Sequence, residues 1–122
     1  MLSLPPSARI FVCLEAADMR RSFDGLSAMV EQVIERDPLS GHLFVFRNRR
    51  GDRVKILWWD KDGLALWYKR LERGVFRFPQ RAGAQAELSA AELMLLLEGI
   101  EVTGMKRRKR YARPEISCNE SA

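Results

Sequence analysis

The fold is decided by residues 43–79, which read LFVFRNRRGDRVKILWWDKDGLALWYKRLERGVFRFP. Runs rich in aromatic and aliphatic residues are separated here by short connections that contain Gly51, Gly63 and Gly74. Short glycine-containing connections between such runs are typical of β-hairpins. The stretch therefore predicts a four-stranded antiparallel β-meander over about residues 43–79, with strands at 43–48, 52–59, 64–71 and 75–78.

An extra strand and an amphipathic helix are expected before the meander. The apolar run at residues 10–14 predicts the N-terminal strand. A stripe of apolar residues at helical spacing predicts a helix over about residues 22–36, with Asp18 or Ser22 as its cap and Pro38 just beyond its end. We expect the strand and the helix to pack together on one face of the meander. The stripe consists of Phe23, Leu26, Met29, Val30, Val33 and Ile34.

A second helix is expected after the meander. Residues 80–87 are rich in Ala, Gly and Gln and are predicted to be a linker. Ser89 and Glu92 have the spacing of a capping box, which predicts a C-terminal helix over about residues 89–98 that Gly99 ends. The fold class is therefore α+β. We expect one domain over residues 1–104 and a basic, disordered tail over residues 105–122.

The composition indicates a globular cytoplasmic protein. The chain has 122 residues, of which 47% are hydrophobic and 30% charged. No apolar run approaches the roughly 18 residues that a bilayer span requires, so no membrane partner is expected. Residues 1–6 lack a basic segment ahead of an apolar core, so no secretion leader is expected. The only two cysteines, Cys13 and Cys118, lie far apart in the sequence and predict free thiols.

Positive charge is concentrated in two segments. The formal net charge is +5, but residues 43–81 carry eleven Lys or Arg and four Asp or Glu, a net of +7. Residues 106–122 add a net of +4, whereas residues 1–42 and 82–105 are acidic, at −2 and −4. Segregation of this kind indicates an anionic partner more strongly than the total charge does.

The candidate nucleic-acid-binding residues are cations of the hairpins and of the tail. Strand alternation places Arg53, Lys55 and Trp59 on one face, and a face that mixes cations with aromatic residues suits nucleic acid. The same pattern also suits an ordinary solvated face, and the residues leave both interpretations open. The candidates are Arg47, Arg49, Arg50, Arg53, Lys55, Lys69, Arg70 and Arg73 in the hairpins, and Lys106, Arg107, Arg108, Lys109 and Arg110 in the tail.

Few residues of the sequence have catalytic or metal-binding potential. His42 is the only histidine and is interpreted as a surface or capping residue. Asp52, Asp60 and Asp62 could together bind a divalent metal, as nuclease carboxylates do, but each is also a standard turn residue at a predicted hairpin. We favour the turn interpretation and predict a protein that is not an enzyme and has no metal site and no cofactor.

The chain also resembles a known family. The resemblance is carried by residues 18–26, DMRRSFDGL, by residues 43–57 and by residues 59–79, which include LWYKRLERG at 66–74. These stretches are similar to the accessory proteins of insertion sequence sixty-six, often labelled TnpB, over roughly residues 7–100. The resemblance implies a role in bacterial DNA transposition beside a larger transposase that carries the catalytic carboxylates. It assigns no catalytic or binding residue.

Two functions of different kinds follow as expectations. The first is a non-catalytic accessory protein that supports transposition by binding DNA through its basic hairpins. The second is a module that binds the transposase and bridges proteins without touching DNA, which the many Trp, Phe and Leu residues of so small a chain favour. RNA in place of DNA stays open, because a cationic aromatic sheet also suits single strands.

Overall fold

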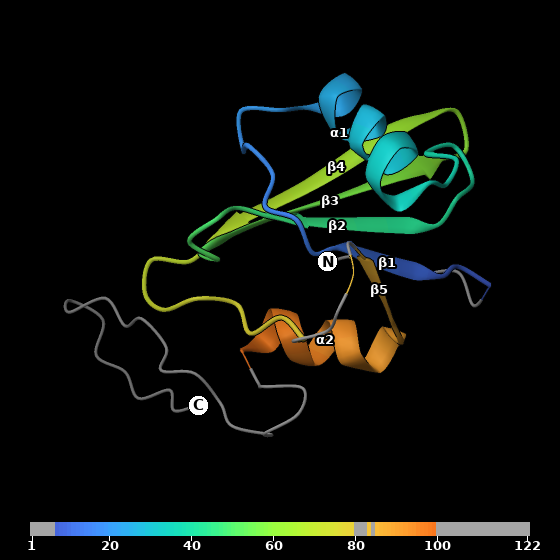
Figure 1. Ribbon diagram of the computed structural model, residues 1–122. Helices are drawn as coiled ribbons and strands as arrows, with labels where there is room; N and C mark the ends of the chain where they lie inside the picture. The colour runs from blue at the N-terminus through green and yellow to red at the C-terminus, as the bar shows by residue number, and fades with distance from the viewer. Residues whose placement is uncertain (1–6, 80–82, 84, 100–122) are drawn as a thin grey trace.

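The chain folds into one mixed five-stranded sheet with a helix on each face. The computed structural model describes residues 7–79, 83 and 85–99, and the strand order is β4-β3-β2-β1-β5 (Figure 1). The α+β class is thus as expected. The elements in chain order are β1 (Ile10–Cys13), α1 (Phe23–Met29), the π-helix η1 (Val30–Ile34), β2 (Leu43–Arg47), β3 (Arg53–Asp60), β4 (Gly63–Arg70), β5 (Gln85–Leu88) and α2 (Ala90–Glu98).

Three of the four predicted meander strands are present. β2 pairs antiparallel with β3, and β3 pairs antiparallel with β4 over eight residues. The predicted fourth strand at 75–78 is wrong, because those residues form no strand and leave the plane of the sheet. Phe76 N donates to Gly51 O at 2.8 Å, and the Phe76 side chain is buried in the core that α2 covers. Residues 75–78 thus bury Phe76 beneath the sheet instead of adding a fourth strand to the meander.

The other half of the sheet differs from the expected topology. β1 lies inside the sheet, parallel to β2, and α1 lies in the connection between them. A parallel pair requires such a crossover, so residues 10–47 form a βαβ unit. The linker prediction for residues 80–87 is wrong in part, because Gln85–Leu88 forms β5 and pairs antiparallel with β1. Its sequence QAEL has low strand propensity, so pairing with β1 is what makes it a strand.

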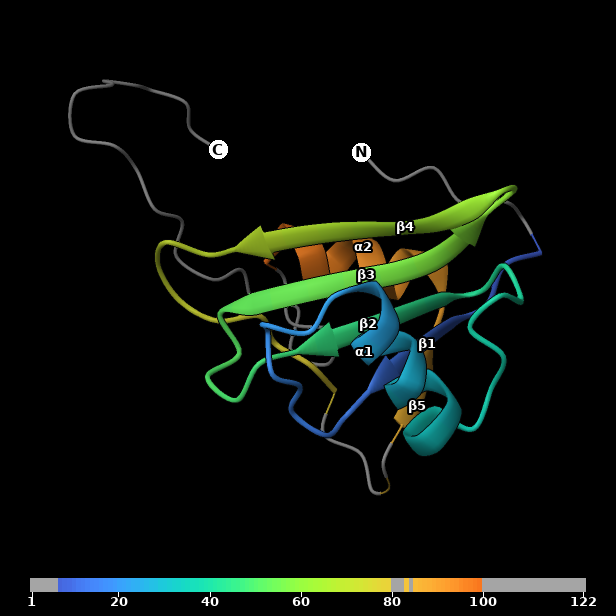
Figure 2. The ribbon, with the colours of Figure 1, turned by 90° about the horizontal axis from the view of Figure 1, so that it is seen from above.

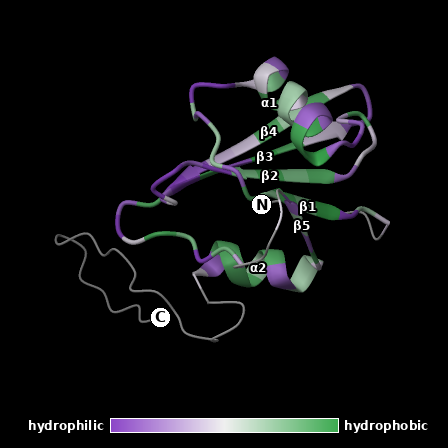
Figure 3. Cartoon of the chain, viewed as in Figure 1, coloured by the Kyte–Doolittle hydropathy of each residue, from purple (hydrophilic) through white to green (hydrophobic). Residues whose placement is uncertain are grey.

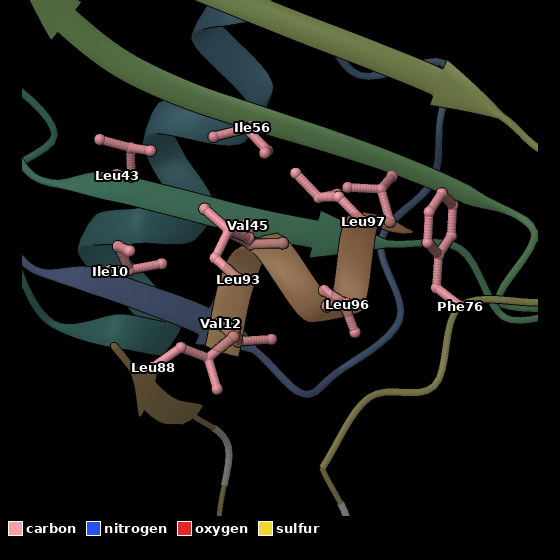
Figure 4. Close-up of a cluster of buried hydrophobic side chains, with 11 residues drawn as sticks. Ile10, Val12, Leu43, Val45, Ile56, Phe76, Leu88, Leu93, Leu96 and Leu97 are labelled. Atoms are coloured by element: carbon pink, nitrogen blue, oxygen red, sulfur yellow. The ribbon is translucent and has the colours of Figure 1, made fainter. Parts of the chain in front are cut away.

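The sheet separates two apolar cores. Figure 1 shows α1 on one face and α2 on the other. The expected packing on one face is therefore right for α1 and wrong for β1, which is a strand of the sheet itself. Burying both faces explains why Leu43–Phe46 is apolar at consecutive positions. The α2-side core is drawn in Figure 4. The α1-side core contains Phe11, Cys13, Ala17, Leu26, Met29, Val30, Ile34, Phe44, Phe46 and Leu57.

The two helices follow their sequence signatures to different degrees. The capping box of α2 is confirmed, since Glu92 N donates to Ser89 Oγ at 3.1 Å and Ser89 N to Glu92 Oε1 at 2.9 Å. The first helix is shorter than predicted, because its last turn widens into η1 and Glu35 adopts a left-handed conformation. Ser22 occupies the N-cap position of α1 without a side-chain cap bond. Neither described helix is long and apolar enough to cross a bilayer.

Candidate nucleic-acid interface

The β2–β3 connection and the C-terminal end of β4 lie at the same end of the sheet. In the β3–β4 register Arg53 lies opposite Arg70, so the β2–β3 connection at 48–52 adjoins residues 71–76. This end is on the left in Figure 1, and its polar connections are purple in Figure 3. We call it the basic end; the exposed or half-buried cations of its loop and of the β3, β4 and 71–76 segments beside it are Arg49, Arg50, Arg53, Lys69, Arg70 and Arg73.

Asn48 organises the tip of the β2–β3 hairpin. Its Oδ1 accepts hydrogen bonds from Gly51 N and Arg53 N, both at 3.0 Å. Its Nδ2 donates to Asp52 Oδ1 at 2.7 Å. This bond, the largest of several causes, lowers the pKa of Asp52. One amide side chain therefore closes the loop that carries Arg49 and Arg50, as Asx residues do in tight turns.

The loop is also fastened to the chain that follows β4. Leu71 N donates to Asp52 O, and Phe76 N donates to Gly51 O, each at 2.8 Å. Gly51 has φ +82, a backbone conformation that residues with a Cβ rarely adopt. The tip is thus held from within by Asn48 and from outside by residues 71–76.

Arg49 and Arg50 are the available cations of this loop. Both are exposed, and neither makes a side-chain hydrogen bond or ion pair with another described residue. They line an open groove of about 430 Å³ together with Ala17, Asp18, Met19, Asn48, Asp52 and Arg53. Two arginines on a fixed loop supply planar, multiply donating groups of the kind that bind phosphate oxygens.

Arg53 and Arg70 form a like-charged pair across β3 and β4. Cations directly opposite on antiparallel strands repel each other, so each needs a partner. Arg53 Nη1 donates to Tyr68 Oη at 2.9 Å, and Arg70 Nη2 bonds Glu72 Oε2 at 3.0 Å. The Arg70–Glu72 pair is half exposed and contributes little stability. An anion between the two guanidinium groups would relieve their repulsion.

Two of the candidate cations serve the fold instead. Lys55 is 6% exposed, and its Nζ donates to Met19 O at 2.9 Å and to Arg21 O at 2.7 Å. The sequence predicted an exposed face that mixes cations with aromatic residues. Lys55 is buried on that face, so we leave it out of the interface. Arg47 is half-buried and donates to Leu14 O and Asn48 O.

The other candidate cations lie on β4, in the segment that follows it and in the tail. Lys69 and Arg73 are exposed, and the register of Lys69 with Val54 places it on the α2 side of the sheet. The tail cations Lys106, Arg107, Arg108, Lys109 and Arg110 lie outside the described residues.

Sequence reasoning missed the contribution of residues 14–21. Because β1 is parallel to β2, both strands end at the basic end, and Ala17 N donates to Arg47 O at 2.8 Å. Arg21 is exposed there and lines a second groove, of about 510 Å³, with Arg49. Arg20 instead pairs with Asp18 at 2.7 Å and lowers the pKa of that carboxyl to about 2. Only the βαβ topology could have revealed this proximity.

The polar groups with catalytic potential do not gather into a site. Asp52 lies at the basic end, whereas Asp60 and Asp62 lie at the opposite end of β3, roughly 25 Å away at the usual rise per residue. His42 Nδ1 accepts from Arg9 N at 2.9 Å. Burial raises the pKa of the Cys13 thiol. Among the described residues no three His, Cys, Asp or Glu side chains are placed to hold a metal ion.

These features define a small α+β protein whose distinguishing surface is a cationic end of the sheet. The family described as "IS66 Orf2 like protein" (TnpB_IS66) matches residues 8–107. The chain belongs to this family, and the resemblance seen in the sequence is confirmed.

Two proteins of Sinorhizobium fredii (strain NBRC 101917 / NGR234) are similar to it. Uncharacterized protein y4hO is 40% identical over 101 residues, which cover 83% of this chain and 88% of that protein. Uncharacterized protein y4jC is 39% identical over 100 residues, covering 82% and 86% of the two chains. No solved structure matches.

Proposed function

We propose that this protein is a non-catalytic accessory factor of insertion-sequence transposition that contacts DNA phosphates through its basic end. Family membership supports the transposition context. The observation that supports DNA contact is the fixed hairpin tip, on which Arg49 and Arg50 are exposed and without a partner among the described residues. The transposase of the element is the second proposed partner, and the cytoplasm is the proposed location.

The local charge balance favours an external anion. Three carboxylates at this end are already engaged: Asp52 by Asn48, Glu72 by Arg70 and Asp18 by Arg20. A fourth, Glu15, lines a groove with Arg49 but forms no ion pair with a described residue. The arginines of the tip are therefore not neutralised from within the described chain. Contacts from such residues to phosphate position a protein on a duplex without reading its sequence, and each neutralised phosphate adds to the salt dependence of binding.

The first experiment measures binding to a labelled terminal-repeat duplex and to a scrambled duplex over a range of salt concentrations. We expect the affinity for both to fall steeply with salt. The variant Arg49→Glu/Arg50→Glu should bind at least about tenfold more weakly and show a smaller salt slope. Wild-type binding that this variant leaves unchanged would contradict the basic-end assignment.

A matched control is available at the other end of the sheet. Lys61 is exposed in the β3–β4 turn, so Lys61→Glu makes the same change in net charge as Arg50→Glu does. Under the proposal Arg50→Glu weakens binding and Lys61→Glu leaves it within about twofold. Equal losses in both variants would mean that only total charge matters.

Protein bridging is the second candidate function. Phe23 and Leu39 are 42% and 50% exposed, and large apolar side chains of this kind can anchor a protein contact. If bridging is the function, the protein co-purifies with the transposase, and Phe23→Ser/Leu39→Ser abolishes the complex while duplex binding is unaffected. No complex at micromolar concentration would count against bridging.

A further inference from the structure

β4 is an edge strand whose outer side is open among the described residues. The sheet order ends at β4, and Figure 2 shows β4 along one outer side of the sheet. Leu71 N bonds Asp52 O, so the odd-numbered residues of this segment direct their backbone groups toward β3. By alternation, the N–H and C=O groups of Leu64, Leu66, Tyr68 and Arg70 face outward, where they can pair with another strand.

The other edge of the sheet is different. β5 has four residues, and its exposed side chains are Gln85 and Glu87, of which Glu87 forms an ion pair with Arg9 at 2.7 Å. Short length and charge are the usual means by which proteins keep an edge strand from pairing. β4 has eight residues in unbroken register with β3 and contains no proline. It therefore lacks the protection that β5 has.

The centre of β4 is apolar on both faces. Leu64 and Leu66 lie on the α1 side, and Ala65 and Trp67 lie on the α2 side. All four are only half-buried. Charges occur only toward the two ends of the strand, with Asp60 and Asp62 before it and Lys69 and Arg70 at its end. One end of this edge is thus acidic and the other basic, apart from Lys61 in the turn.

We propose that β4 pairs antiparallel with β4 of a second copy of this chain and makes one continuous ten-stranded sheet across a twofold axis. Antiparallel self-pairing brings the acidic end of each copy to the basic end of the other. Backbone hydrogen bonds supply the attraction, and the half-buried apolar side chains of both copies cover one another. This proposal does not depend on DNA binding.

Charge complementarity selects one register. A twofold axis normal to the sheet keeps the α1 faces together, so residues that lie opposite each other must come from the same face. With Leu66 opposite Leu66 of the second copy, Leu64 meets Tyr68 and Ala65 meets Trp67. Asp62, in the turn just before β4, then comes beside Arg70. Moving the centre by one residue in either direction removes the Asp62–Arg70 pair, since Asp62 then lies opposite Tyr68 or Glu72. The structure therefore favours the register centred on Leu66.

The first test is a charge exchange measured by sedimentation equilibrium at low salt. We expect the wild-type protein to form dimers at about 100 µM or below. Asp62→Arg alone and Arg70→Asp alone each place like charges opposite each other twice and should weaken the dimer about tenfold or more. An equimolar mixture of these two variants restores both pairs and should recover the dimer. Asp62 and Arg70 are exposed, so both variants should keep the fold.

The second test fixes the register by cross-linking, in a background where Cys118 is replaced by Ser and Cys13 is left in the core. Directly opposite residues of an antiparallel pair have Cα atoms about 5.5 Å apart, within the range of a disulfide. Mixed Leu64→Cys and Tyr68→Cys proteins should therefore cross-link on mild oxidation. Leu64→Cys alone should not, because its two copies would lie roughly 13 Å apart.

Three outcomes would overturn the proposal. One is a protein that stays monomeric at about 100 µM, far above the dissociation constant of an ordinary specific dimer. Another is a dimer that the charge exchange leaves unchanged, and the third is a dimer in which Leu64→Cys cross-links with itself. None of these results bears on the salt-dependent duplex binding of the wild-type protein, so the two proposals fail separately.

Discussion

The strands and the tip of the β2–β3 hairpin carry the same residue types and use them differently. In the strands, Lys55 is buried and donates to two backbone carbonyls, and Arg47 donates to two more. At the tip, two and three residues after Arg47 along the chain, Arg49 and Arg50 are exposed. Cation density in a sequence therefore locates a positive region without telling which cations can meet a ligand.

The reason for the difference lies in the segment that leads into α1. Met19 and Arg21 precede the helix, so the i to i+4 bonds of α1 do not use their carbonyl groups. A buried ammonium group such as that of Lys55 requires hydrogen-bond acceptors. The ammonium group of Lys55 has three N–H donors and reaches both carbonyl groups, and it also lies 4.7 Å from the centre of the Tyr68 ring. A cation at this position replaces missing backbone bonds.

The largest expected effect is therefore on stability, in the strands. Lys55→Met keeps the aliphatic stem but removes the donors to Met19 O and Arg21 O, so it should lower the free energy of unfolding by about 3 kcal/mol. Chemical denaturation with urea measures this value. Lys69→Met is the matched control on the neighbouring strand, because Lys69 is exposed, and should change stability by about 0.5 kcal/mol or less. Equal effects of the two substitutions would contradict a structural role for Lys55.

Local sequence rules predicted the elements whose cause is local. The two hairpins follow from glycine-containing turns between apolar runs, and α2 follows from Ser89 and Glu92, which make both bonds of the capping box. Gly99 then ends α2 in a left-handed conformation, as expected. Each of these signatures involves residues within a few positions of one another, so a single sequence contains the information.

The failed predictions depend on distant pairing. QAEL at 85–88 becomes β5 only because β1 is beside it, and Phe76 leaves the sheet because the core beneath it offers more burial. The burial of Lys55 has the same origin, since its partners lie 36 and 34 residues away. The candidate interface was therefore predictable as a region, whereas the separation of Lys55 from Arg49 and Arg50 required the fold.

The next effect, at the tip, links stability with binding. Asn48→Ala removes three side-chain hydrogen bonds from the loop, and we expect a loss of about 2 kcal/mol in the free energy of unfolding. Duplex affinity should also fall although no cation is removed, because Arg49 and Arg50 lose their fixed positions. Titration calorimetry with the terminal-repeat duplex, together with urea denaturation, measures both quantities.

Asn48→Asp sharpens this test. The carboxylate keeps an acceptor for Gly51 N and Arg53 N but loses the donor to Asp52 and places two negative charges side by side. Its stability should fall by about as much as that of Asn48→Ala at neutral pH and partly recover in acid, where one carboxyl is protonated. Unchanged duplex affinity in both variants would mean that the order of the loop is irrelevant to binding.

The smallest expected effect concerns the ionisation of Asp52. Asn48 Nδ2 bonds its carboxylate, which holds the pKa of Asp52 below its ordinary value. A carboxyl whose pKa is lowered by folding contributes stability above its unfolded pKa, and this contribution is lost as the pH falls through the folded pKa. Carbon-13 NMR titration should therefore find Asp52 titrating at a lower pH in the wild type than in Asn48→Ala. The same pKa in both proteins would show that the Asn48–Asp52 bond does not form in solution, and the tip would then owe its order to residues 71–76.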